Sequence, residues 1–171
     1  MGYSISTLAS SALVIGAGAT AATDAWAVIR RKLFGVAAPD WGLVGRWIGH
    51  MPRGRFRHPS MAKAAAVGRE RLIGWLAHYF IGIAFAAVLL SIWGREWIGA
   101  PTPGPALLVG MVSVVAPFFL MQPGMGAGIA ASRTPRPAAA RLQSLLTHLV
   151  FGLGLYAAGL VNRSFDSSSL S

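Results

Sequence analysis

The sequence predicts an all-α polytopic membrane protein in which four transmembrane helices form a bundle. Hydrophobic residues make up 54% of the 171 residues and charged residues only 12%, a balance far from that of a soluble domain. Four apolar windows also reach the roughly 20 residues that a helix needs to cross the hydrocarbon of a bilayer. These windows lie at about 8–29, 74–93, 104–123 and 142–161. We expect one membrane domain over 1–161 and a disordered, serine-rich tail over 162–171.

Basic residues predict how the four helices are oriented. Of the fifteen Lys and Arg, ten lie between Arg30 and Arg71, and three more lie between the third and fourth windows. Because basic loops stay on the cytoplasmic side, we expect both of these connections in the cytoplasm and both termini outside. Attraction to anionic membrane lipid is sufficient to explain the charge, so nucleic acid is not an expected partner.

The first connection, residues 30–73, is the only long segment between the windows. Asp40 is placed to cap a short helix over WGLVGRWIG, and Ser60 is placed to cap a second helix that starts at MAKAAAVG. Apolar and basic residues alternate here as in an amphipathic segment that lies on a membrane surface. We expect a cytoplasmic lid or platform, not a second domain.

Two further patterns shape the third and fourth helices. Pro117 lies inside the third window and predicts a kink there, with backbone carbonyls freed near Ser113. Pro137 is placed to begin the fourth helix. The glycine-rich stretches GAGAT (16–20) and GMGAGIAA (124–131) follow no strand, so they indicate close helix packing instead of a nucleotide-binding turn.

Three ionisable side chains on three different helices share one depth. Asp24, His78 and His148 each lie six or seven residues inward of a basic boundary residue, which is roughly 9–11 Å at 1.5 Å per residue. On each helix the residue one turn nearer the midplane is small, which leaves either space for a ligand or a close helix contact. These small residues are Thr20, Gly82 and Gly152.

An ionisable group in a membrane helix is costly unless it is paired or hydrated, so these three residues are functional candidates. His78 and His148 could ligate a haem b on its two sides. With Asp24 and Glu70 they could instead bind a divalent transition metal, and the absence of cysteine restricts any ligands to nitrogen and oxygen. A polar network that only fixes helix packing, with Asp24 and Gln122 bonding the histidines, is the open alternative.

Other polar residues could extend this site. If residues 30–73 fold back over the bundle, the two loop histidines join it. Neither a cysteine nucleophile nor a GxSxG motif is present, so the sequence identifies no catalytic residue and leaves enzymatic activity open. The additional candidates are His50, His58, Tyr79, Gln122 and Ser144.

Two other functions also fit the sequence. In a small proton-coupled transporter, Asp24 and the histidines would exchange protons, and Pro117 would provide a moving joint. In a homo-oligomer, or as a structural or assembly subunit of a larger membrane complex, the glycine-lined faces would be helix contacts. Membrane lipid is an expected partner in every case.

Four segments of the chain carry a resemblance to a known family. They are GRWIGHMPRGRFRH (45–58), GWLAHYFIG (74–82), APFFLMQPGMGAGIAASRTP (116–135) and HLVFGLGLY (148–156). Together they resemble a family of small bacterial inner-membrane proteins known as a domain of unknown function, family 2938. The resemblance implies a four-helix protein of the bacterial cell inner membrane, and it carries no established activity, substrate or ligand. In that membrane, the two termini that the basic loops place outside are periplasmic.

Overall fold

The computed structural model describes residues 5–168, and every regular element in this range is a helix. Three long helices are α1 (Ile5–Phe34), α3 (Glu70–Gly99) and α6 (Pro137–Ser168). Together with the segment that starts at α4 (Pro103–Val112), they supply four helices long and apolar enough to cross a membrane. These four cover Ser6–Phe34, Glu70–Gly94, Pro103–Met125 and Pro137–Ser164. The prediction of an all-α, four-helix membrane bundle is therefore confirmed.

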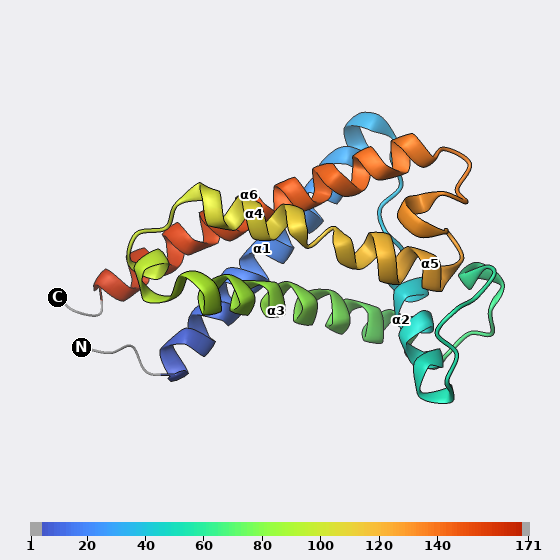
Figure 1. Ribbon diagram of the computed structural model, residues 1–171, viewed down its shortest axis with the longest axis horizontal. Coiled ribbons are helices and arrows are strands. Elements are labelled where there is room, and N and C mark those ends of the chain that lie inside the picture. The colour runs from blue at the N-terminus through green and yellow to red at the C-terminus, as the bar shows by residue number, and fades with distance from the viewer. Residues whose placement is uncertain (1–4, 169–171) are drawn as a thin grey trace.

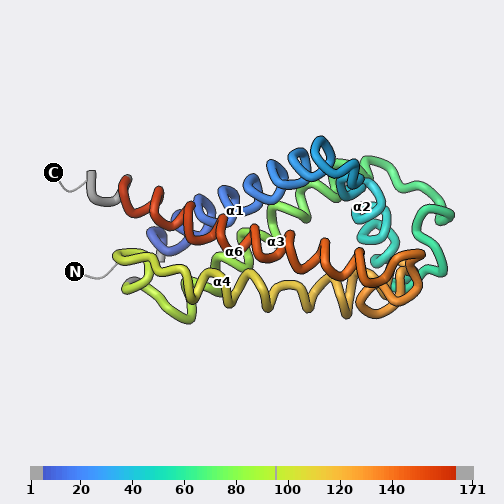
Figure 2. Tube along the Cα trace, turned by 90° about the horizontal axis from the view of Figure 1, so that it is seen from above, coloured from blue at the N-terminus to red at the C-terminus, as the bar shows by residue number. Residues whose placement is uncertain are grey.

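The two ends of the bundle differ in what they carry (Figures 1 and 2). The start of α1 and the end of α6 lie at one end of the bundle, while α2 (Trp41–His50) and the loop after it lie at the other. Helix α1 packs against α3 and α6, and α4 packs against α6, whereas α3 and α4 contact each other less. The short 3-10 turns η1 (Met51–Arg53), η2 (Met61–Lys63) and η4 (Ile129–Ala131) complete the helical elements.

Close backbone contacts hold the long helices together. A Cβ atom at Gly16 of α1 would meet the backbone of Ile83 in α3, and one at Gly110 of α4 would meet the backbone of Gly152 in α6. Small residues allow this approach, which drives helix association where lipid is as apolar as the side chains. Residues 16–20 therefore pack as predicted.

The second glycine-rich stretch was predicted to be a helix contact, and the structure makes it a turn. Gly126 and Gly128 have φ angles of 95° and 76°, a conformation that glycine adopts without steric cost. A Cβ at Gly126 would also meet the carbonyl oxygen of Pro59, so the turn packs against the loop between α2 and α3.

The third span is interrupted as its proline predicts. Helix α4 ends before Ser113, and the chain continues as a π-helix, η3 (Pro117–Met121), and then as α5 (Gln122–Met125). Because Pro117 has no N–H group, the carbonyl of Ser113 has no donor four residues on. It accepts instead from the N–H of Ala116 at 3.1 Å. The predicted break near Ser113 is confirmed.

Residues 35–69 form a folded unit over one end of the bundle, here called the cap. Asp40 begins α2, and its side chain accepts a hydrogen bond from the N–H of Gly42 at 2.9 Å, as predicted. The predicted cap at Ser60 is wrong, because its side chain makes no capping bond and only the short turn η2 follows. In this segment, Arg46 donates hydrogen bonds to the carbonyl groups of Met61, Ala62 and Ala64, so these carbonyls do not accept in a continuing helix.

The end of the chain also differs from the expectation of a disordered tail. Helix α6 continues through Ser168, and residues 169–171 lie outside the described range. Asn162 is buried and donates a hydrogen bond to the Ser11 hydroxyl at 3.2 Å. Helix α6 therefore stays packed against α1 beyond the end of the apolar window.

Candidate ligand-binding site

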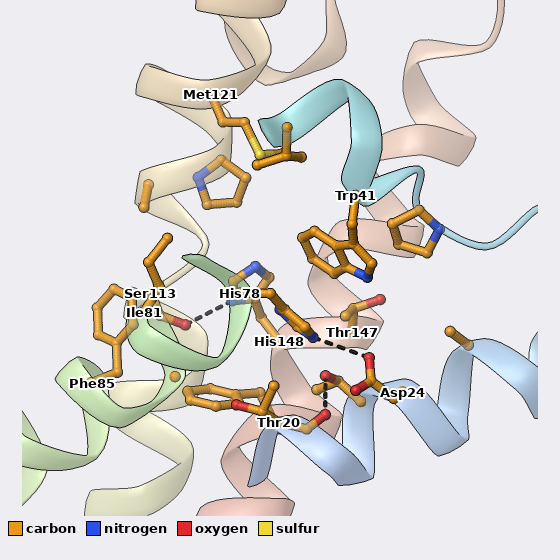
Figure 3. A pocket seen from close by; sticks show the side chains of 18 of the residues that line it. Thr20, Asp24, Trp41, His78, Ile81, Phe85, Ser113, Met121, Thr147 and His148 are labelled. Carbon is orange, nitrogen blue, oxygen red and sulfur yellow. Dashed lines mark hydrogen bonds and ion pairs between the residues drawn. The ribbon is translucent and has the colours of Figure 1, made fainter. Parts of the chain in front are cut away.

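A cavity of about 360 Å³ lies beneath the cap, between the helices of the bundle. Helices α1, α3 and α6, the interrupted third span and α2 all contribute to its walls (Figure 3). Its volume falls within the roughly 300–1,000 Å³ typical of small-molecule pockets. The amphipathic segment expected on the membrane surface thus turns its apolar face to the bundle, and α2 lines the cavity through Trp41, Val44, Trp47 and Ile48.

Asp24 joins two helices at the floor of this cavity. Its Oδ1 lies 3.0 Å from Nε2 of His78, and its Oδ2 accepts a hydrogen bond from the Tyr79 hydroxyl at 3.0 Å. The imidazole and the carboxylate share one proton in this bond. Trp41 stacks on the imidazole with ring centroids 3.8 Å apart. The ring of His78 is therefore fixed from α1 and from the cap.

His148 reaches the same cavity from α6. Its Nδ1 lies 2.7 Å from the hydroxyl of Ser113, and that hydroxyl donates to the carbonyl of Gly110 at 2.6 Å. Because the hydroxyl has only one proton, the imidazole donates through Nδ1–H. Nε2 of a neutral His148 is then an acceptor. The serine that holds this histidine directly follows the end of α4 and is buried.

Glu70, a proposed metal ligand, belongs to a different contact. It accepts two hydrogen bonds from the Arg46 guanidinium, from Nε at 2.8 Å and from Nη2 at 2.7 Å, and one from the N–H of Val67 at 3.0 Å. The hydrogen bonds to Glu70 raise the pKa of Arg46 above its ordinary value. This pair ties α2 to the start of α3 and does not line the cavity.

The other polar candidates also pair outside the cavity. His50 bonds the carbonyl of Ala65 through Nε2 at 2.9 Å, and its Nδ1 lies 3.3 Å from Nε2 of His58. The amide of Gln122 donates to the Ser144 hydroxyl at 3.4 Å. The cap does fold over the bundle, but its two histidines bond each other and not His78. Ser144 likewise pairs with Gln122, whereas His148 pairs with Ser113.

The side chains expected to bind a metal are divided among these contacts. Within residues 5–168, no group of three or more His, Asp or Glu side chains is arranged to hold a metal ion. Of the four expected ligands, Asp24, His78 and His148 line the cavity, while Glu70 is engaged by Arg46. The site that remains has two oriented imidazoles and one carboxylate around an apolar space.

One cavity residue was not recognised as part of the site from the sequence. Arg30 served only to mark the membrane boundary, yet it lines the cavity and is 7% exposed. Its neighbour Arg31 is exposed. A signal was present, because one face of α1 with three- and four-residue spacing lines the cavity. That face consists of Thr20, Thr23, Ala27 and Arg30.

Comparison with known proteins gives one match. The family described as Protein of unknown function (DUF2938) matches residues 13–162, a range that contains every residue lining the cavity. No curated protein and no solved structure matches the chain.

Proposed function

The chain belongs to the family described as Protein of unknown function (DUF2938), and we propose that it binds a small, mostly apolar organic molecule beneath the cap. The cavity of about 360 Å³ is the observation that carries this proposal. Small-molecule sites combine apolar walls with a few placed polar groups. The apolar walls include Phe85, Leu120, Met121 and Phe151, and the polar groups include Asp24, His78 and His148.

A cavity-filling variant with a matched control tests this function. Ala27 lines the cavity, whereas Ala25 on the same helix is exposed. Native mass spectrometry of the protein released from mild detergent should show a bound small molecule in the wild type and in Ala25→Leu. The Ala27→Leu variant should lose it because the added side chain fills the space. A wild type without any bound organic molecule, in every detergent tried, would argue against the proposal.

We further propose that the cap faces the cytoplasm of a bacterium and the bundle spans its inner membrane. Support comes from the charge: the cap end carries ten Lys and Arg within residues 30–71 and three more within 133–141, of fifteen in the chain. Alkaline phosphatase, which is active only outside the cytoplasm, should be active when fused after Gly99 and inactive when fused after Gly54. The reverse pattern would invert the topology and place the cap in the periplasm.

A haem or metal on the two histidines has less support than an organic ligand. Nε2 of His78 is bonded to Asp24, and Trp41 covers one face of its ring. Nδ1 of His148 is bonded to Ser113. An optical spectrum and a metal analysis of the purified protein should therefore show neither a Soret band nor stoichiometric metal. A signal that disappears in the double variant His78→Ala, His148→Ala would overturn this expectation.

Proton-coupled transport is a second candidate, favoured by one specific arrangement. Asp24 bonds a histidine inside the cavity, and the third span is broken beside it at Ser113, where a helix can bend. In liposomes, flux of the ligand found by mass spectrometry should then depend on pH, and His78→Ala should abolish that dependence. His58→Ala, in the cap and outside the cavity, is the control. Ligand binding without any flux would contradict transport and leave ligand binding as the function.

A further inference from the structure

Arg30 is a buried cation without a partner in the described part of the chain. Its side chain is 7% exposed, and its Nε is fully buried with no hydrogen-bond partner. None of the hydrogen bonds or ion pairs of the described residues involves its guanidinium. Buried charged groups are almost always paired, because removing a charge from water without compensation is costly. Such a residue needs a partner that residues 5–168 do not supply.

Two ordinary explanations do not account for the unpaired burial of the Arg30 side chain. Arginines near the ends of membrane helices extend their head group to the interface, which leaves the residue exposed. Arg30 is instead 7% exposed, and its Nε is fully buried. The carboxylate nearest in sequence, Asp24, is already engaged through both oxygens, by His78 and by Tyr79. The cation therefore faces the cavity without a neutralising group.

The position of Arg30 along the cavity indicates how a ligand would lie. Arg30 is in the last turns of α1, at the cap end, together with the cavity residues Pro39 and Trp41. The aromatic side chain of Phe85 is seven residues beyond His78, roughly 10 Å deeper toward the middle of the bundle. The cavity therefore has a cationic end beneath the cap and an apolar end within the membrane.

We propose that the ligand is an acidic amphiphile, with its anionic head at the Arg30 guanidinium and its apolar chain directed toward Phe85 and Phe151. This inference rests on the proposed binding function and specifies the chemical class of the ligand. A guanidinium offers paired N–H donors that match the two oxygens of a carboxylate or phosphate. The same anionic head occurs in free medium-chain acids and in membrane phospholipids.

The test compares an acid with its alcohol in nanodiscs of phosphatidylcholine. Decanoate and decanol share one apolar chain, and tryptophan fluorescence reports their binding because Trp41 and Trp47 line the cavity. Wild-type protein should bind decanoate roughly tenfold or more tightly than decanol, as expected for a charge-assisted hydrogen bond. The Arg30→Gln variant should lose this preference while still binding decanol. Arg30→Lys should restore part of it, and the exposed Arg31→Gln should resemble the wild type.

The outcomes separate this inference from the function it rests on. Equal binding of decanoate and decanol by the wild type, or an acid preference retained in Arg30→Gln, would overturn the acidic ligand and leave the binding function intact. Binding of neither probe, together with no co-purified molecule, would overturn both. Repeating the titration with phosphatidylglycerol in the nanodiscs identifies the source of the head group. Competition with decanoate points to a membrane lipid, and unchanged affinity points to a free acid.

Discussion

The two halves of the bundle differ in packing. The half near the start of α1 and the end of α6 is closely packed, whereas the half beneath the cap contains a cavity. Toward the chain ends, side chains such as Ile15, Leu89 and Leu155 are completely buried and close the space between the helices. Toward the cap, the same helices leave a cavity of about 360 Å³ that α2 helps to line. The difference shows that one set of helices packs closely at one end and surrounds a cavity at the other.

Polar groups follow the same division. In the packed half, the buried side chains of Asn162 and Ser11 share a hydrogen bond that connects α6 to α1. In the open half, Asp24 and His78 pair but still line a space, and Arg30 has no partner among the described residues. Polar groups thus serve helix packing at one end and a binding surface at the other.

The test with the largest expected effect adds one methyl group at Gly16, where α1 contacts α3 in the packed half. A Cβ at Gly16 would meet the backbone of Ile83, which cannot rotate away as a side chain can. We expect Gly16→Ala to cost about 1–3 kcal/mol, the usual cost of overpacking. For a chain of this size that corresponds to a loss of about 2–4 °C in Tm per kcal/mol. Thermal unfolding in detergent, followed by size-exclusion chromatography, measures it.

The matched control is Gly99 of α3, at which an added Cβ would meet nothing within 4 Å. Gly99→Ala should leave the Tm unchanged or slightly raised, since alanine favours helix more than glycine does. Equal destabilisation by both substitutions would mean that backbone proximity does not account for the stability of the packed half.

The second test removes a contact that holds the cap on the bundle, at a residue that does not line the cavity. Arg46→Gln removes the paired hydrogen bonds to Glu70 and the bonds to the carbonyls of residues 61, 62 and 64. We expect amide hydrogen exchange of residues 41–50 to become several-fold faster, with helix α6 unchanged. Arg53→Gln is the control, because Arg53 is exposed and carries none of these bonds. Unchanged exchange in Arg46→Gln would show that contacts such as the close approach of Gly45 to Glu70 suffice.

The third test asks whether the polar groups of the open half act as pairs. A double-mutant cycle of Asp24→Ala and Tyr79→Phe should give a coupling energy of roughly 1 kcal/mol, because the two share a 3.0 Å hydrogen bond. A cycle of Asp24→Ala and Ser113→Ala should give a coupling within about 0.5 kcal/mol, since they share no partner. Equal coupling in both cycles would indicate one connected network instead of two separate contacts.

Sequence reasoning succeeded where depth and helix direction alone determine proximity. Asp24 and His78 were placed at one depth on adjacent spans, and they are hydrogen-bonded. The break before Pro117 also followed directly from the missing N–H group. Both inferences need only local geometry and the length of a membrane helix.

Sequence reasoning stopped where contacts depend on how the cap folds. Glu70 was grouped with His78 by their spacing on one helix, but Arg46, far away in sequence, engages its carboxylate. The role of Arg30 was missed for a similar reason, because its burial comes from elements that meet only in the folded protein. No periodic pattern encodes the partner of Glu70. The spacing of Thr23, Ala27 and Arg30 places these residues on one face of α1, but it does not show which elements bury that face.

The smallest expected effect separates two capping residues that looked alike in the sequence. Asp40 accepts a hydrogen bond from Gly42 at the start of α2, whereas Ser60 makes no capping bond. Asp40→Ala should therefore destabilise α2 by about 1 kcal/mol, and Ser60→Ala should stay within about 0.5 kcal/mol of the wild type. Hydrogen exchange within α2 measures both. If the two variants behave alike, the start of α2 is set by its packing on α3, where Gly45 meets Glu70, and not by its cap.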